Sequence, residues 1–306
     1  MDNAQYKMKR RFIPPLLALT AGILAVSTAS TFIRLAQQEV HPLAIAAWRL
    51  IIGGAVFLIA ALIRQKNFFK HITRKEFLLI MLSGMLLAIH FGTWITSLSL
   101  TSVTASVVLV TCYPLFVAFG SSLFFRESFT PVMYAGIFMA FIGSVIIGIG
   151  DMGSESHHIT GDVLALAGAI SIAGYFIIGK KLRSHVPLIE YVALTYGSAA
   201  VFLFTAVLIS GVRLTGFSSF SWLWIGMIAL IPQITGHTLL NFSLKYMSAT
   251  AVTLPILAEP VISVLLAWIV LSEQPPLQAV FGGFIILIGL YLAQSKLMKK
   301  NKGIME

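Results

Sequence analysis

Ten apolar runs, each about as long as a bilayer crossing, constrain the fold of this chain more than any other feature. They lie near residues 14–34, 43–63, 76–97, 102–125, 131–150, 161–179, 188–210, 221–241, 249–271 and 277–295. A helix needs about 20 apolar residues to cross the hydrocarbon core of a bilayer. In lipid only helices or closed barrels satisfy their own backbone, and these runs lack the strict alternation of barrel strands. The sequence therefore predicts an all-α membrane protein with ten transmembrane helices.

The composition supports lipid as the solvent for most of the chain. Of the 306 residues, 58% are hydrophobic and only 10% are charged, whereas about a quarter of a soluble domain is charged. The net charge of +10 does not indicate a nucleic-acid partner, because the basic residues stand at the ends of apolar runs and no basic face carries interleaved aromatic residues. The lipid bilayer is therefore an expected partner, and nucleic acid is not.

The charged loops predict how the chain crosses the membrane. With the N-terminus placed in the cytoplasm, 18 of the 21 lysines and arginines fall on the cytoplasmic side. Arg34 and Arg213 fall outside, and Arg49 falls within the second run. Basic loops stay in the cytoplasm, so we expect a multi-pass protein of the cell (inner) membrane. Both termini are then cytoplasmic basic tails, at residues 1–12 and 297–306.

The second half of the sequence repeats the first at an offset of 146 residues. The offset pairs a threonine–alanine dipeptide, a proline, a glutamate and three glycines: Thr104-Ala105 with Thr250-Ala251, Pro114 with Pro260, Glu127 with Glu273, and Gly22, Gly136 and Gly143 with Gly168, Gly282 and Gly289. We place the repeats at residues 13–150 and 160–296, with five runs each. An odd number of crossings inverts the second repeat, and inverted repeats are typical of secondary transporters with a substrate site near the midplane.

No motif for a cofactor, a metal ion or a catalytic centre stands out, and we expect none of these. Cys112 is the single cysteine, which excludes a disulfide or a cysteine metal cluster within the chain. Residues 148–153 spell G-x-G-x-x-G, but at the end of an apolar run rather than between a strand and a helix. His157 and His158 are adjacent loop histidines, which are usually solvated. The sequence lacks a nucleotide P-loop, which argues against transport driven by its own ATP hydrolysis.

The paired motifs resemble the EamA-type family of the drug/metabolite transporter superfamily. The resemblance extends over essentially the whole chain and implies ten helices, cytoplasmic termini and carriage of metabolites, often outward. Arg49 also resembles an arginine that is common at that place in the family. The two halves differ just before the motif proline, where the first has Tyr113 and the second has Glu259. The halves are therefore not chemically equivalent around the expected site.

Glu259 is the only carboxylate deep in an apolar run, where an ionisable group costs about 3 kcal/mol and needs a partner or a cavity. Pro255 and Pro260 flank it, remove two backbone donors and loosen the helix. We expect Glu259 to carry a proton or to contact an amine of the substrate. The alternative is a structural ion pair with Arg49, which could instead anchor its own helix by reaching the outer membrane surface.

Polar side chains on other runs are further candidates for a substrate site. Gln233, His237 and Asn241 share one face of the eighth run, and His90 and Trp94 share one face of the third. In lipid such a stripe turns inward, where it lines a cavity or bonds neighbouring helices. A histidine there could shuttle protons near neutral pH or serve only in packing. Aromatic rings and hydroxyls near the expected midplane complete the set: Tyr113, Tyr175, Thr111 and Trp268.

The sequence predicts a secondary transporter of small metabolites, without enzymatic activity. Efflux of amino acids or related organic compounds by alternating access is the main hypothesis. Uptake by the same fold is one alternative, and a membrane-embedded enzyme or scaffold is another, although a catalytic cluster is missing from the sequence. Small-residue faces built on Gly136, Ala140, Gly143, Gly282 and Gly289 suit close packing inside the chain, and a homodimer contact is their alternative use.

Overall fold

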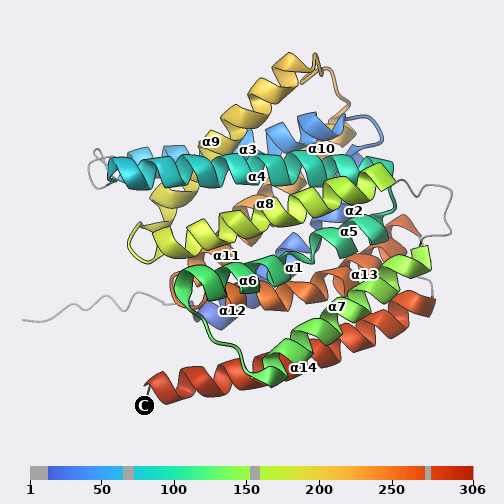
Figure 1. Cartoon of the computed structure of the whole chain (residues 1–306). Coiled ribbons are helices and arrows are strands. Elements are labelled where there is room, and N and C mark those ends of the chain that lie inside the picture. The colour runs from blue at the N-terminus through green and yellow to red at the C-terminus, as the bar shows by residue number, and fades with distance from the viewer. Residues whose placement is uncertain (1–12, 65–71, 152–158, 273–276, 306) are drawn as a thin grey trace, which may run out of the picture.

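The computed structural model describes residues 13–64, 72–151, 159–272 and 277–305, which form ten helical rods lying side by side (Figure 1). Six rods are unbroken helices: α3 (Pro42–Arg64), α4 (Arg74–Leu100), α7 (Pro131–Asp151), α8 (Ile159–Arg183), α9 (Leu188–Ile209) and α14 (Leu277–Met305). Four are broken: α1–α2 (Pro15–Val26, Ala29–Ala36), α5–α6 (Val103–Val110, Tyr113–Phe125), α10–η2–α11 (Ser219–Ile228, Ala229–His237, Thr238–Ser243) and α12–η3–α13 (Ala249–Thr253, Leu254–Ala258, Glu259–Leu271).

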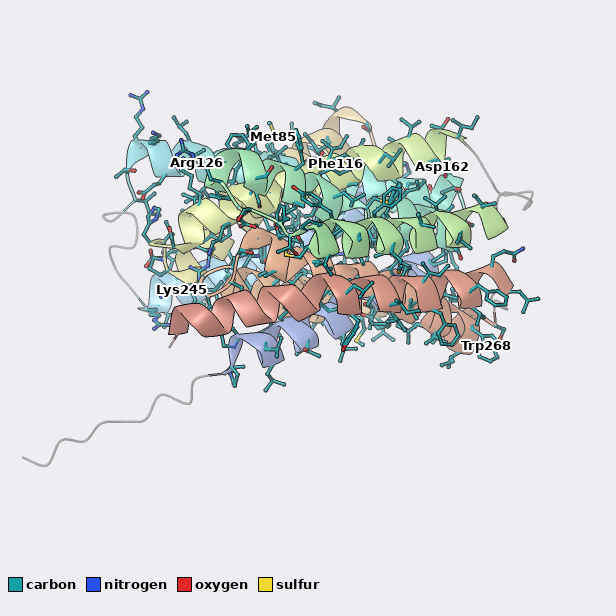
Figure 2. All side chains as sticks on the ribbon, turned by 60° about the horizontal axis from the view of Figure 1, so that its bottom comes forward. Met85, Phe116, Arg126, Asp162, Lys245 and Trp268 are labelled. Carbon is teal, nitrogen blue, oxygen red and sulfur yellow. The ribbon has the colours of Figure 1, made fainter. Side chains whose placement is uncertain are left out.

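The lengths and surfaces of these rods suit a bilayer. Within the described residues, eight rods are long and apolar enough to cross a membrane, and α7 and α14 contribute shorter apolar segments. Large apolar side chains such as Phe116 and Met85 project from the outside of the bundle, while Arg126 and Lys245 lie at one end (Figure 2). The predicted all-α fold with ten membrane helices is confirmed.

The antiparallel pair α7 and α14 shows how the two repeats are related. A methyl group added to Gly136 would lie 2.6 Å from the carbonyl oxygen of Gly289, and one added to Gly143 would lie 2.6 Å from that of Gly282. The 146-residue offset exchanges these two contacts, so a two-fold pseudo-symmetry axis passes between the helices. Because the helices run in opposite directions, the axis is perpendicular to them and the repeats are inverted.

The repeats are interleaved rather than set side by side. Gly22 of α1 packs on η2, where a methyl group added to it would lie 3.3 Å from the carbonyl oxygen of Gly236. The offset maps this pair onto Gly168 of α8 and His90 of α4, where the same distance is 3.4 Å. The first helix of each repeat thus packs on the third helix of the other, and neither repeat forms a compact unit alone.

Prolines accompany the helix irregularities at η2 and η3, and the sequence predicts the second of these. Pro255 and Pro260 accompany the 3₁₀ segment η3, and Pro232 lies inside the π-helical segment η2. A proline removes one backbone donor and crowds the preceding turn, so the local hydrogen-bond spacing changes. The chain also leaves helical geometry at equivalent points: Arg126 and Ser272, 146 residues apart, have φ of 54° and 59°.

Gly289→Ala destabilises the protein, whereas Gly283→Ala in the same helix does not. A methyl group at Gly289 would lie 2.6 Å from backbone atoms of α7, and overpacking of this kind costs about 1–3 kcal/mol. At Gly283 the nearest atom is 3.4 Å away, an ordinary contact, so alanine is neutral or gains about 0.5–1 kcal/mol from its helix propensity. Thermal unfolding in detergent checks this, and equal melting temperatures for the two variants would contradict the packing argument.

Candidate functional site

A small buried cavity of about 30 Å³ lies at the middle of the bundle, with room for about one water molecule. All its lining side chains are buried: Val26, Ala29, Arg49, His90, Trp94, Val110, Tyr113, Ile172, His237, Leu240 and Glu259. Three pairs of lining residues are related by the 146-residue offset: Val26 with Ile172, Trp94 with Leu240, and Tyr113 with Glu259. The cavity therefore lies on the pseudo-symmetry axis, between the repeats.

Arg49 brings a fixed positive charge to this cavity. Its Nε donates to the side-chain oxygen of Gln233 at 2.7 Å, and its guanidinium lies 3.9 Å from the centre of the Phe91 ring. Both terminal nitrogens are buried and have no hydrogen-bond partner among the described residues. Arginine is only 1% exposed here, so it does not reach the outer membrane surface, the alternative that the sequence left open. Four N–H groups remain for a ligand.

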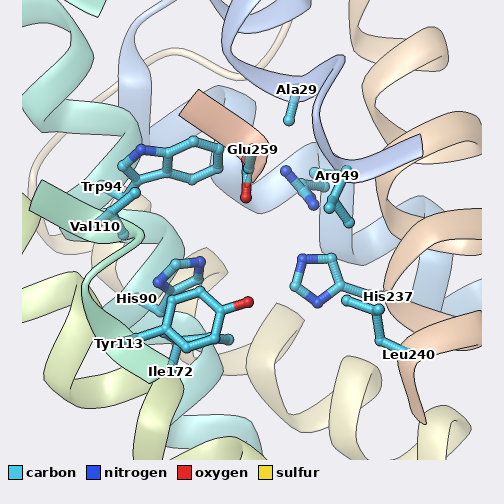
Figure 3. Close-up of a pocket in the computed structure, with 11 residues that line it drawn as sticks. Ala29, Arg49, His90, Trp94, Val110, Tyr113, Ile172, His237, Leu240 and Glu259 are labelled. Carbon is cyan, nitrogen blue, oxygen red and sulfur yellow. The ribbon is translucent and has the colours of Figure 1, made fainter. Parts of the chain in front are cut away.

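Glu259 shares the cavity with Arg49, and the two side chains do not form an ion pair in the described part of the chain. Figure 3 shows the polar ends of Arg49, Glu259, His90, Tyr113 and His237 turned toward the same space. A buried charge without a contacting counter-charge is costly. A proton or a cationic ligand group removes that cost for the carboxyl group, and an anionic group does so for the guanidinium.

The two histidines occupy different environments in the cavity wall. Nδ1 of His90 lies 3.0 Å from the carbonyl oxygen of Gly168. Because a carbonyl only accepts, this nitrogen carries the hydrogen, and Nε2 is left as an acceptor. The His90 ring stacks on Trp94 at 5.6 Å between centres. His237 packs against Phe91, as His90 also does, and its Nδ1 has no hydrogen-bond partner within residues 13–64, 72–151, 159–272 and 277–305.

A polar layer lies next to the cavity, around Asn241. The side-chain amide of Asn241 donates to the hydroxyl of Tyr175 and, at 2.7 Å, to the carbonyl oxygen of His237. It also lies 3.4 Å from the hydroxyl of Tyr196, which is 3.3 Å from Thr238. Tyr175, Tyr196 and Asn241 are fully buried. We call these three residues the tyrosine–asparagine layer.

The structure brings most of the predicted site residues together. Six line the cavity: Arg49, His90, Trp94, Tyr113, His237 and Glu259. The other three lie beside it, since Gln233 holds Arg49 and Tyr175 and Asn241 belong to the polar layer. Their roles in transport stay predictions.

Two other residues near the predicted midplane lie apart from the site. Trp268 is 49% exposed on the outside of the bundle, and the hydroxyl of Thr111 donates to the carbonyl oxygen of Val107. Sequence reasoning missed Phe91 and Tyr196. Each looks like an ordinary packing residue of its helix, and no signal short of the tertiary contacts distinguishes them.

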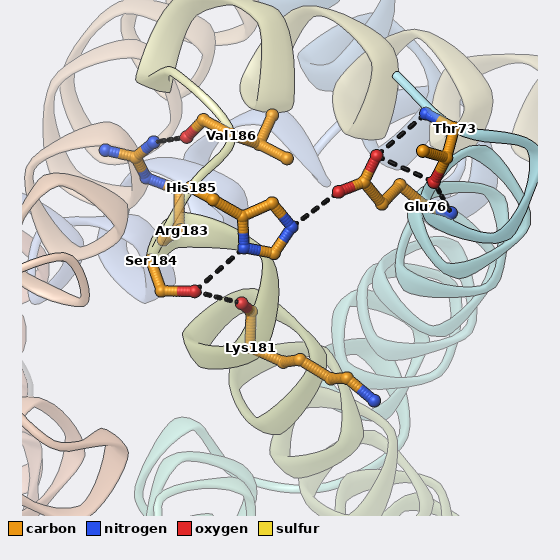
Figure 4. Close-up of polar contacts among 7 residues, drawn as sticks. All are labelled: Thr73, Glu76, Lys181, Arg183, Ser184, His185 and Val186. Carbon is orange, nitrogen blue, oxygen red and sulfur yellow. Dashed lines mark hydrogen bonds and ion pairs between the residues drawn. The ribbon is translucent and has the colours of Figure 1, made fainter. Parts of the chain in front are cut away.

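Both ends of the bundle are held by contacts between the repeats. At one end the Glu39 carboxylate, between α2 and α3, accepts hydrogen bonds from the backbone and side chain of Ser218 at the start of α10. At the other end His185, between α8 and α9, lies 2.6 Å from Glu76 at the start of α4 (Figure 4). The 146-residue offset maps Glu39 onto His185, so the two contacts occupy equivalent places with different chemistry.

Comparisons with known proteins agree with this architecture. The model of the EamA-like transporter family matches residues 13–149 and again residues 159–294. The chain is 24% identical over 297 residues to the uncharacterized transporter YdfC of Bacillus subtilis (strain 168), covering 96% of this chain and 95% of that protein. It is 27% identical over 284 residues to an uncharacterized transporter of Archaeoglobus fulgidus, covering 92% and 98%. A solved crystal structure shares the fold, with a TM-score of 0.75 at 20% identity over 91% of this chain and 96% of that one.

Glu39→Gln lowers the melting temperature at neutral pH, and the loss disappears in acid. Hydrogen bonds from Ser218 and then Ser221 hold the pKa of Glu39 below its ordinary value of 4.5. A lowered pKa stabilises the folded state above the unfolded-state value, and this contribution is lost as pH falls through the folded-state pKa. The melting temperatures of the wild type and of Glu39→Gln at about pH 7, 5 and 3 measure this contribution. A difference that grows on acidification would contradict the assignment.

Proposed function

This chain belongs to the EamA-like transporter family, and on that premise we propose that it exports small zwitterionic metabolites, amino acids or related organic compounds, by alternating access. It is a multi-pass membrane transporter and not an enzyme. The single observation that supports the substrate class is the central cavity. There Arg49 offers unpaired N–H groups while the Glu259 carboxyl faces the same space.

The proposed binding mode matches each charge of an α-amino acid to one side chain. The substrate carboxylate would accept hydrogen bonds from both terminal nitrogens of Arg49, whose planar fork suits a carboxylate. The substrate ammonium group would lie against Glu259, and Trp94 and Tyr113 would face the side chain. Because Arg49 and Glu259 do not neutralise each other by contact, a zwitterion lowers the cost of both buried charges together.

Alternating access fits a cavity that is buried and too small for a metabolite. Its volume of about 30 Å³ holds about one water molecule, so binding requires the helices to separate on one side at a time. The breaks at η2 and η3 supply places where the backbone hydrogen-bond pattern already departs from α-helical spacing. We propose these breaks as the hinges.

We propose that Glu259 also couples transport to a proton gradient, with His90 and His237 as secondary proton carriers. A buried carboxyl group that loses its cationic ligand takes up a proton more readily than it stays charged. Glu259 would then bind either the substrate or a proton, but not both at once. Such mutually exclusive binding is what exchange of substrate for protons across the membrane requires. His90, with Nε2 free to accept, lies on the same cavity.

We propose that the protein lies in the cell (inner) membrane with both termini in the cytoplasm. The support is the excess of lysine and arginine on one side. We place the repeats at 13–150 and 160–296; residues 1–12 lie outside the described part, and α14 continues through most of the predicted tail at 297–306. A homodimer would need a surface other than the α7 and α14 glycines, because these pack against each other.

Uptake by the same fold is the alternative. The geometry of a buried cavity allows it equally, because the cavity does not show in which direction the substrate moves. A scaffold without transport is disfavoured, because burying Arg49 and Glu259 without mutual contact is costly and would bring a scaffold no benefit. Export and uptake are separated by metabolite profiling of cells and medium, with and without the gene. Export predicts that the substrate accumulates inside the cells that lack the gene.

Arg49→Gln reduces transport of the preferred amino acid by about tenfold or more. Hydrogen bonds to a charged group contribute about 1.5–3 kcal/mol, and glutamine cannot replace the guanidinium fork. Initial rates in proteoliposomes, with a panel of radiolabelled neutral amino acids, measure the effect. Arg213→Gln is the matched control, because Arg213 is an exposed arginine at the end of the bundle. Normal rates for Arg49→Gln would exclude the proposed carboxylate contact.

Glu259→Gln abolishes the response of transport to an imposed pH gradient. Glutamine keeps the size of the side chain but cannot exchange a proton. The wild type should accelerate several-fold when a pH gradient is imposed on proteoliposomes, and the variant should show the same rate with and without it. Glu39→Gln, which removes a carboxylate outside the cavity, should respond as the wild type does. Full activity of Glu259→Gln with unchanged pH dependence would overturn the proton role.

A further inference from the structure

A second cavity, of about 470 Å³, lies at the basic end of the bundle. The ends of α3, α8, α9 and α11 line it. Among its described lining residues three are cationic and one is acidic: Arg64, Arg183, Lys245 and Glu190. Arg64 and Lys245 are exposed, so the cavity is open to this face of the protein. Unlike the central cavity, it has room for a small metabolite.

The basic cavity is connected to the central one through a short series of contacts. Arg183 in its wall is only 2% exposed, and its Nε donates to the backbone oxygen of Asn241 at 3.1 Å. A second guanidinium nitrogen donates to the backbone oxygen of Val186 (Figure 4). Asn241 in turn bonds Tyr175 and the backbone of His237, which lines the central cavity. The tyrosine–asparagine layer therefore separates the two cavities.

At the opposite end of the bundle, a neutral side chain takes the place of Arg183. The 146-residue offset maps Arg183 onto Gln37 and Asn241 onto Ile95. The side-chain amide of Gln37 donates to the backbone oxygen of Ile95 at 2.7 Å, so a neutral side chain makes the equivalent contact. Tyr175 maps onto Ala29, so the polar layer also lacks a counterpart there. The backbone contact therefore does not require a cation, and it does not account for the positive charge of Arg183.

We propose that the basic cavity is the inner vestibule of the transport path. In this view it is a second, weak binding site that receives the carboxylate of the substrate before the tyrosine–asparagine layer opens. This inference rests on the proposed function. Arg64, Arg183 and Lys245 raise the local concentration of the anionic group, and Arg183, joined to Asn241, lies where the carboxylate would enter. Phe242 and Leu188 give the apolar part of the substrate a surface.

One-sided kinetics test the vestibule. The probe is the radiolabelled neutral amino acid that the wild type transports fastest, applied to either face of oriented proteoliposomes. Arg183→Gln, which copies the residue at the opposite end, and Lys245→Gln should each raise KM at the basic face about fivefold, the effect of one unit charge near contact distance in water. The maximal rate and KM at the opposite face should not change. High salt should remove the difference in KM at the basic face between Lys245→Gln and the wild type.

Arg74→Gln is the matched control, because Arg74 is an exposed cation at the start of α4 outside the cavity. The vestibule proposal is wrong if Arg74→Gln raises KM as much as the cavity variants do, or if those variants raise KM equally at both faces. If the wild type transports no amino acid, the proposed function has failed instead. Wild type in pure phosphatidylcholine should keep its KM. If the KM of the wild type rises there as the KM of the variants does in vesicles that contain phosphatidylglycerol, the cavity is a lipid headgroup site and the proposal is overturned.

Thiol labelling tests the separating layer without any substrate. Ile172→Cys, in a Cys112→Ser background, places one thiol in the central cavity. A membrane-impermeant maleimide added at the basic face should label it on the order of fivefold faster when Asn241→Ala or Tyr175→Phe removes a hydrogen bond of about 1 kcal/mol. Labelling from the opposite face should not accelerate. Unchanged labelling in both variants would show that the layer does not close the path.

Discussion

The guanidinium of Arg49 is buried in the middle of the bundle, and its burial constrains the groups that pack around it. Gln233 must turn its oxygen, not its amide nitrogen, toward Nε, and Phe91 must present its ring face. These two contacts hold the side chain but leave the charge unbalanced. The acid that could balance it, Glu259, lies on the same cavity without touching it. Among the described residues, the cavity therefore leaves the terminal N–H groups of Arg49 and the carboxyl group of Glu259 available to a ligand.

The pseudo-symmetry makes clear which features are scaffold and which are chemistry. Packing contacts occur twice, as in the glycine contacts of α7 with α14 and of α1 and α8 with their partners. Each polar side chain of the central cavity, in contrast, occurs in only one of the two repeats. Glu259 corresponds to Tyr113 and His237 to Phe91, although each pair lies on or beside the same cavity. A duplicated fold can lose polar residues from one copy without losing packing, which leaves one asymmetric site on the axis.

The helices, the inversion of the repeats and most of the polar residues of the site were predictable from the sequence. Apolar run length fixes the helices because lipid permits few other structures, and the offset between the halves requires inversion once each contains five crossings. Buried polar residues such as Arg49, Glu259 and His237 stand out because they are costly in lipid. The interleaving of the repeats was not predictable, because Gly22 contacts Gly236 across 214 positions and a single sequence carries no trace of such pairing. For the same reason Tyr196 and Phe91 were missed.

Interleaving also decides what can move. Because the first helix of each repeat packs on the third helix of the other, rocking one sequence half against the other would break close helix contacts that join the repeats. Under the proposed alternating access, we therefore expect each moving unit to contain helices from both repeats. Their ends are joined by Glu39 and Ser218 at one face and by His185 and Glu76 at the other. A carboxylate on neutral serines and a carboxylate on a histidine are chemically different contacts, so the two ends of this pseudo-symmetric fold are not held in the same way.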